Sequence, residues 1–174
     1  MRSTVVAEPV RILGVDPGSQ ITGFGIIDLA AGKTVAVEWG SIKTEGSHAA
    51  RLRTIFLELG RIVRDFRPAE IAVEQVFVHR NADSALKLGQ ARAAAICATF
   101  EADLPLFEYT PRHIKKAVVG NGGAEKAQVE HMVRLLLGVR EPIAPDAADA
   151  LAAALCHAHE RGTRSMLARA VAAT

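Results

Sequence analysis

Several features that define common protein classes are scarce in this chain of 174 residues. The only two cysteines, Cys97 and Cys156, form no CxxC pair, which disfavours a disulfide framework and indicates buried thiols in a reducing compartment. No window approaches the roughly 20 apolar residues that span a bilayer. The first dozen residues contain Arg2 and Arg11 but lack an apolar core of signal-peptide length. We therefore expect a cytoplasmic protein without a membrane segment.

Charge of one sign and aromatic side chains are also limited. The chain carries 21 Lys and Arg against 19 Asp and Glu, a net charge of +2 that permits a polyanionic partner without requiring one. Aromatic residues make up 5% of the sequence, so an aromatic side chain in a polar stretch is informative. Apolar residues make up 49% and charged residues 23%, as in globular proteins. The length fits one domain that buries a core.

The order of predicted elements indicates an α/β domain. Three strand-like runs, at 11–15, 22–29 and 34–42, are separated by the short connections DPGSQ and AAGK, which predict antiparallel hairpins. Two more strands are predicted at 71–73 and 105–109, and helices at 47–66, 81–100, 111–119, 124–137 and 145–160. This order predicts a five-stranded mixed sheet flanked by helices. We expect residues 1–10 to be a flexible segment, residues 11–162 the folded domain, and residues 163–174 a mobile charged tail.

Two of the apolar runs end on an acidic residue. Asp16 follows a buried run and precedes Pro17 and Gly18, and Glu74 follows the run at 71–73. Taken singly, Asp16 is a plausible turn residue and Glu74 a plausible exposed strand end. A carboxylate at the end of a core strand nevertheless costs desolvation free energy unless it has a partner. If these strands are parallel neighbours, both carboxylates lie at one edge of the sheet.

A second pair of acids opens the last predicted helix. Asp146 and Asp149 are three residues apart on one helical face, where like charges repel by a few tenths of a kcal/mol, and the surrounding alanines offer no counter-charge. Asp146 alone also suits a helix N-terminus. Four converging carboxylates would provide the hard oxygen ligands that Mg²⁺ prefers. Two such ions, about 4 Å apart, are suited to phosphodiester hydrolysis.

Five long segments carry a family resemblance. ILGVDPGSQITGFGIID, AVEQVF, NADSALKLGQAR, VVGNGGAEKAQVEHMV and DAADALAAAL resemble, in this order, segments of the RuvC family, the Holliday-junction resolvases of bacteria in the RNase H-like nuclease superfamily. They span most of residues 11–157. The resemblance implies an RNase H-like fold in which Asp16, Glu74, Asp146 and Asp149 are the catalytic acids and metal ligands. It also implies two Mg²⁺ ions per site, which Mn²⁺ can replace.

Several further positions are candidate DNA contacts. Phe77 lies in the polar stretch VFVHRN, and it is either a core aromatic or a side chain that stacks on a base, a contact worth about 1–3 kcal/mol. The resemblance favours a DNA contact for Phe77, and the basic residue Arg80, three positions later, is a further candidate DNA contact. It also places Lys115 and Lys126 near the scissile phosphate, although each could be an ordinary surface lysine. We interpret the histidines at 79, 113, 131, 157 and 159 as surface or helix residues without metal spacing.

The resemblance implies a crossover junction endodeoxyribonuclease. Such an enzyme resolves four-way DNA junctions in recombination and repair by paired symmetric nicks, leaving 5′-phosphate and 3′-hydroxyl ends. The implied partners are junction DNA, a second copy of the chain and the branch-migration proteins RuvA and RuvB. The predicted dimer helix carries small residues at Ala85, Gly89 and Ala93, a face that a monomer would instead use as core.

Three other functions are compatible with parts of the sequence. An RNase H-type ribonuclease would use the same acids. An actin-like ATPase shares the Asp-x-Gly strand end followed by Thr22 and Gly23, but it needs a second domain that 174 residues cannot supply. A junction-binding protein without catalysis would be expected to lack one of the four acids.

Overall fold

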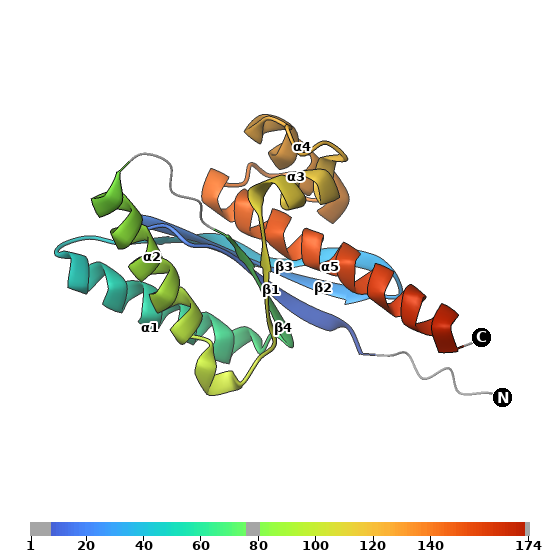
Figure 1. Cartoon of the computed structure of the whole chain (residues 1–174), viewed down its shortest axis with the longest axis horizontal. Coiled ribbons are helices and arrows are strands. Elements are labelled where there is room, and N and C mark those ends of the chain that lie inside the picture. The colour runs from blue at the N-terminus through green and yellow to red at the C-terminus, as the bar shows by residue number, and fades with distance from the viewer. Residues whose placement is uncertain (1–7, 76–80, 173–174) are drawn as a thin grey trace.

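The protein is a mixed five-stranded sheet between two layers of helices (Figure 1). The computed structural model describes residues 8–75 and 81–172. The strands are β1 (Val10–Asp16), β2 (Ile21–Ala30), β3 (Lys33–Lys43), β4 (Glu70–Glu74) and β5 (Leu106–Tyr109). They lie in the order β3-β2-β1-β4-β5. The first three pair antiparallel, whereas β1, β4 and β5 pair parallel, as the sequence predicts for a mixed sheet.

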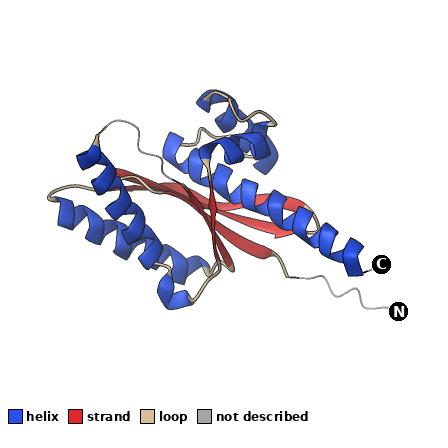
Figure 2. Ribbon diagram, in the orientation of Figure 1, coloured by secondary structure: helices blue, strands red, loops and turns tan. Residues whose placement is uncertain are grey.

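Helices cover both faces of the sheet (Figure 2). One face carries α1 (His48–Phe66) and α2 (Ala82–Cys97), followed by a short 3₁₀ turn (Phe100–Ala102). The other face carries α5 (Pro145–Ala172), which contacts β1 and β2 and is flanked by α3 (Pro111–Val119) and α4 (Lys126–Leu137). Figure 1 shows α5 running diagonally across the sheet, with α3 and α4 beyond it.

Strand alternation divides the core into two apolar clusters. In β1, Leu13 and Val15 pack toward α1 and α2, while Ile12 belongs to the cluster under α5. In β4, Ile71 and Val73 face α1 and α2, while Ala72 faces α5. Successive side chains of a strand point to opposite faces, so the even-numbered residues of β1 and β4 share the α5 face.

Local sequence signals set the element ends. The Ser47 side chain accepts a hydrogen bond from the backbone of Ala50 at the start of α1, and Thr110 does the same for His113 at the start of α3. At the other end, Gly138 adopts a positive φ of 67° after α4, a conformation that favours glycine. The predicted five strands and the helix at 111–119 are therefore confirmed.

Some predicted boundaries are wrong. Helix α5 continues to Ala172 instead of ending near Glu160, so residues 163–172 are helical where a tail was predicted. Helix α2 ends at Cys97, and α4 begins at Lys126 instead of Ala124. The two thiols are unpaired, but Cys97 is exposed and only Cys156 is buried. In the described part of the chain, no helix is long and apolar enough to cross a membrane.

Candidate active site

Two carboxylates lie at the same edge of the sheet. Strands β1 and β4 pair parallel with Val15 opposite Val73, so Asp16 and Glu74 follow at the same level. Both are even-numbered positions of their strands and therefore share the face that α5 covers. Both residues are half-buried. The predicted meeting of these two acids at neighbouring parallel strand ends is thus confirmed for the backbone.

Glycine residues bring the start of α5 down onto this edge. Gly23 of β2 is the register partner of Asp16, and a Cβ atom at Gly23 would lie 1.9 Å from the carbonyl oxygen of Asp146. Similarly, a Cβ atom at Gly14 would lie 2.0 Å from the carbonyl oxygen of Ala150. Only glycine permits so close an approach of helix backbone to strand backbone. The first two turns of α5, which carry Asp146 and Asp149, are therefore held beside Asp16.

The loop after Asp16 is fastened by two threonines. The buried Thr22 hydroxyl donates to the carbonyl oxygen of Gly18 at 2.9 Å, which closes the turn between β1 and β2. The Thr44 hydroxyl lies 3.0 Å from the carbonyl oxygens of both Ser19 and Gln20, and its backbone N–H donates to Gln20. These contacts fix the loop that borders the site. The sequence analysis did not assign this role to either threonine.

The four acids act on one another electrostatically. Burial, followed by the charges of Asp149 and Asp146, raises the pKa of the Asp16 carboxyl to about 7, against the lowering effect of Lys126. Burial and the charges of Asp16 and Asp149 together raise the pKa of Glu74 to about 8. Asp146 and Asp149 are half-buried at the same place. The site is therefore a concentration of negative charge that the protein itself neutralises only in part.

Two lysines provide that partial neutralisation. The Lys126 ammonium donates to the Asp149 carboxylate at 3.0 Å, and this bond raises the pKa of Lys126. Lys115 of α3 is close enough to lower the pKa of Glu74. The alanines around Asp149 offer no counter-charge, but Lys126 supplies one from 23 positions earlier in the chain.

The donor chemistry of the site fits a hard divalent cation. Four half-buried carboxylates offer oxygen ligands, and a cation would relieve the repulsion that raises the pKa of Asp16 and Glu74. Among the described residues, however, no three Asp, Glu, His or Cys side chains lie close enough to hold one metal ion in this arrangement. Cation binding would therefore draw the carboxylates together and displace Lys126 from Asp149.

The structure brings most of the predicted site residues together, although their catalytic roles remain predictions. Asp16, Glu74, Asp146 and Asp149 cluster with Lys115 and Lys126. Phe77 and Arg80, the other two predicted DNA contacts, lie outside the described residues, as does His79.

One of the histidines interpreted as surface or helix residues lies in a helix but not at the surface. His157 is fully buried and bonded on both ring nitrogens instead of lying at the surface. Its position within the alanine-rich run AALCHAH was the signal that it faces the core.

Comparison with known proteins identifies the family. The sequence profile described as crossover junction endodeoxyribonuclease RuvC matches residues 12–157. A relative with the same description from Methylococcus capsulatus is 57% identical over 162 residues, which cover 92% of this chain and 98% of the relative. Another from Halorhodospira halophila is 54% identical over 153 residues, covering 87% of this chain and 91% of the relative.

Solved structures agree with the sequence relatives. RuvC from Thermus thermophilus superimposes with a TM-score of 0.78 at 34% identity, covering 88% of this chain and 96% of that one. The T. thermophilus RuvC complex with a Holliday junction substrate gives a TM-score of 0.82 at 35% identity, covering 87% and 94%. Sequence and fold thus agree with these relatives over most of the chain, which belongs to the RuvC family of crossover junction endodeoxyribonucleases.

Proposed function

We propose that this chain resolves four-way DNA junctions in homologous recombination and repair by hydrolysing phosphodiester bonds at paired, symmetric positions. The observation that carries the proposal is the convergence of four half-buried carboxylates beside two lysines at one sheet edge. The fold shared with a RuvC protein in complex with a Holliday junction substrate supports the choice of substrate.

Each acid has a role in binding the cofactor. Asp16, Glu74, Asp146 and Asp149 would hold divalent cations, for which we assign two Mg²⁺ ions per site, replaceable by Mn²⁺. Bound cations would supply a nucleophile at neutral pH and stabilise the leaving oxygen. Asp16 and Glu74, whose raised pKa values favour the protonated form, would hold a cation as carboxylates after losing their protons. Hydrolysis of this kind leaves 5′-phosphate and 3′-hydroxyl ends.

Basic and aromatic side chains would position the DNA. Lys126 is 78% exposed, and so exposed an ion pair is weak enough for its ammonium to exchange Asp149 for a phosphate. Lys115 is half-buried beside Glu74 and would contact the same DNA strand as Lys126, near the scissile bond. Phe77 and Arg80, which follow Glu74 in the sequence, are assigned to base stacking and phosphate binding.

We further propose that two copies of the chain act together. One side of α2 is buried through Ala91 and Ala95, whereas Leu86 is 63% exposed on the other side. A Cβ atom at Gly89 would meet nothing within 4 Å. An exposed stripe of small and apolar residues on a helix favours close packing against a symmetric copy. Family membership also implies contacts with RuvA and RuvB and action in the cytoplasm, which co-sedimentation and cell fractionation would test.

One assay tests the proposed function directly. A labelled four-way junction, a plain duplex and an RNA:DNA hybrid are each incubated with the protein in Mg²⁺ or EDTA. We expect paired cuts in the junction alone, in Mg²⁺ alone, with ends that a ligase can seal. Asp16→Asn should bind the junction and leave it uncut, because the change removes a ligand charge and little volume. Cutting by Asp16→Asn at the parent rate would contradict the site assignment, and preferential cutting of the hybrid would favour a ribonuclease.

A further inference from the structure

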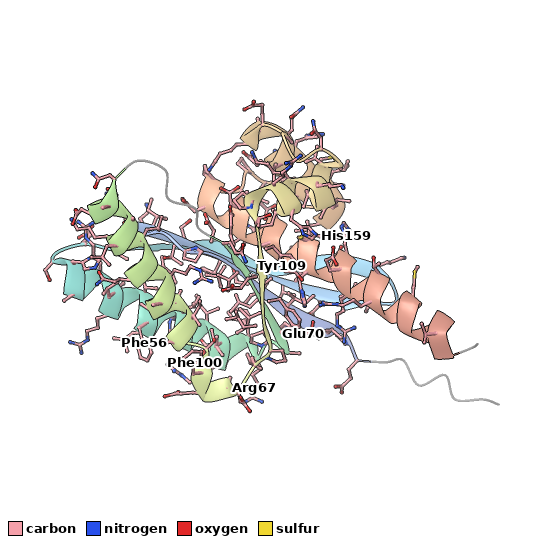
Figure 3. All side chains as sticks on the ribbon, viewed as in Figure 1. Phe56, Arg67, Glu70, Phe100, Tyr109 and His159 are labelled. Atoms are coloured by element: carbon pink, nitrogen blue, oxygen red, sulfur yellow. The ribbon has the colours of Figure 1, made fainter. Side chains whose placement is uncertain are left out.

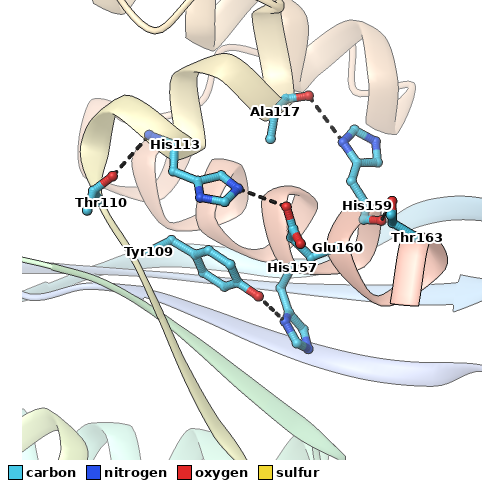
Figure 4. A network of polar contacts seen from close by, with 8 residues as sticks. All are labelled: Tyr109, Thr110, His113, Ala117, His157, His159, Glu160 and Thr163. Atoms are coloured by element: carbon cyan, nitrogen blue, oxygen red, sulfur yellow. Dashed lines mark hydrogen bonds and ion pairs between the residues drawn. The ribbon is translucent and has the colours of Figure 1, made fainter. Parts of the chain in front are cut away.

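A buried polar chain crosses the core between α5 and the sheet. His157 of α5 is fully buried, and its Nδ1 lies 2.7 Å from the Tyr109 hydroxyl oxygen (Figure 4). Its Nε2 lies 2.6 Å from Oε2 of Glu70, the first residue of β4. The Arg161 Nε lies 3.0 and 3.2 Å from the two Glu70 carboxylate oxygens. The proposed chemistry uses none of these four residues.

The direction of each hydrogen bond follows from the charge states. Burial lowers the pKa of His157 more than Glu70 raises it, so the imidazole is neutral. Burial raises the pKa of Glu70, but bonds from His157 and Arg161 outweigh that effect and leave a carboxylate. A carboxylate only accepts, so the His157 Nε2–H donates to Glu70, and Nδ1 accepts from the Tyr109 hydroxyl. The chain is fully satisfied in one orientation only.

The hydrogen-bonded chain joins the elements that carry three of the four acids, Glu74, Asp146 and Asp149, to the element that carries Lys115. Tyr109 is the register partner of Glu74 in the pairing of β4 with β5, and its carbonyl oxygen accepts from the Gln75 backbone at 2.8 Å. The next residue, Thr110, caps α3, which carries Lys115. His157 lies on the helix that begins with the other two acids, about 12 Å along its axis from Asp149. Figure 3 locates Tyr109 and Glu70 between α5 and the opposite helical layer.

The bond between Tyr109 and His157 is buried, whereas the polar contacts of α5 with α3, from Glu160 to His113 and from His159 to the carbonyl oxygen of Ala117, are exposed. Alanines dominate the buried face of α5, and the closest backbone contacts of this helix with the sheet, at Gly14 and Gly23, involve Asp146 and Ala150, which precede His157 in the helix. The His157 ring is also stacked on Phe107, with ring centroids 4.3 Å apart. A hydrogen bond tolerates neither a slide of an ångström nor a turn of the helix, since both lengthen or bend it.

We propose that Tyr109 and His157 are positioning residues whose mutual hydrogen bond sets the α5 acids and Lys115 against Glu74. The proposal rests on the proposed function of those acids. Neither side chain touches the reacting groups, and the effect is exerted through the backbones of α5, β5 and α3. A misplacement of about 1 Å at reacting groups can cost roughly a hundredfold in rate.

The test uses Tyr109→Phe, which removes one oxygen atom and keeps the ring. Four-way junction cleavage gives kcat at saturating Mg²⁺, filter binding in EDTA gives the junction Kd, and electron paramagnetic resonance gives Mn²⁺ affinity. We expect kcat to fall roughly tenfold or more and Mn²⁺ to bind more weakly, with the junction Kd within about twofold of the parent. His157→Gln, which retains an acceptor and a donor, should keep more activity than His157→Leu.

A matched control separates positioning from stability. Ile55→Val removes one methyl group from the cluster on the opposite face of the sheet and costs about 0.5–1.5 kcal/mol without touching a hydrogen bond. When each protein is assayed the same number of degrees below its own melting temperature, Ile55→Val should cut the junction at the rate of the parent protein. Parent kcat and Mn²⁺ affinity in Tyr109→Phe would overturn the proposal, as would an equal loss in Ile55→Val. If Tyr109→Phe does not fold, the histidine pair gives the same readouts.

The experiment also distinguishes this proposal from the assignment of the acids. Asp16→Asn is assayed in parallel. If Asp16→Asn cuts normally, the acidic site itself is misassigned. If Asp16→Asn is inactive while Tyr109→Phe keeps parent values of kcat and Mn²⁺ affinity, only the positioning role fails.

Discussion

At the scale of single residues, the site holds its acids in a state that the protein alone does not favour. Asp16 and Glu74 have pKa values of about 7 and 8 because they are half-buried among other carboxylates. Such a cluster persists because the backbone contacts at Gly23 and the parallel pairing of β1 with β4 place it there. The clustered carboxylates thus lower the stability of the fold at the place where a cation is to bind.

The raised pKa values predict how stability depends on pH without divalent cations. Between the ordinary value of 3.8 and about 7, folded Asp16 holds a proton that the unfolded chain has released, so its contribution to folding is lost as the pH rises. Asp16→Asn has no carboxyl group at this position to ionise, so the variant does not lose this stability as the pH rises. We expect the variant to melt roughly 2–4 °C above the parent at pH 8 and to show little difference at pH 4, by calorimetry in EDTA.

Divalent cations provide the control for that measurement. Mg²⁺ favours the ionised carboxylates and should raise the Tm of the parent more than that of Asp16→Asn. If the two proteins have the same Tm at every pH in EDTA, the Asp16 carboxyl does not destabilise the folded protein.

Lys126 competes with any cation for Asp149. Removing its ammonium with Lys126→Ala should tighten Mn²⁺ binding by roughly two- to fivefold, because an exposed ion pair contributes a free energy of this size. The same change should slow junction cleavage. Titration by electron paramagnetic resonance measures the first effect and single-turnover cleavage the second. Lys33→Ala, at the exposed start of β3, is the charge-matched control and should change neither. Weaker Mn²⁺ binding in Lys126→Ala would contradict competition.

At the scale of elements, the close contact between α5 and the sheet decides where two of the acids lie. Gly23→Ala would put a methyl group 1.9 Å from the Asp146 carbonyl oxygen, so the start of α5 must move. We expect a loss of about 1–3 kcal/mol in stability by urea denaturation and a larger proportional loss of cleavage. Gly162→Ala is the matched control, because a Cβ atom there meets nothing within 4 Å and alanine favours the helix. Full activity in Gly23→Ala would show that the contact does not position Asp146.

The same scale shows how far the sequence could be read. Apolar runs that end on Asp16 and Glu74 predicted two strand ends, because alternation and turn residues are local signals. The end of α5 was placed twelve residues too early, since the charged stretch after Glu160 continues the helix although it leaves the core. Lys126 with Asp149, and His157 with Tyr109 and Glu70, were missed because each pairing joins residues far apart in the chain.

At the scale of the whole molecule, the two helical layers differ in their position relative to the acidic site. Helices α3, α4 and α5 surround the acidic site, while α1 and α2 cover the opposite face (Figure 1). The exposed side of α2 carries Leu86, Gly89 and Ala93. A two-fold axis at this side would relate two acidic sites, one in each copy, as two nicks in a four-way junction require. The proposed assembly is therefore compatible with the position of α2 as well as with its sequence.

Gly89→Arg tests the dimer because it places a long charged side chain on an exposed helix position where a Cβ atom has free space. The fold should survive, since arginine favours a helix more than glycine does. A packed symmetric interface should be lost, because each copy would bury an unpaired charge in it. We expect monomers by sedimentation velocity and, on a cruciform plasmid, single nicks in place of linear product. Leu135→Arg puts the same charge on α4, where the leucine is 64% exposed, and should leave dimers and paired cuts intact. A monomeric Gly89→Arg protein that still linearises the plasmid would refute the need for two copies while leaving the nuclease site unaffected, because each acidic cluster is complete within one chain.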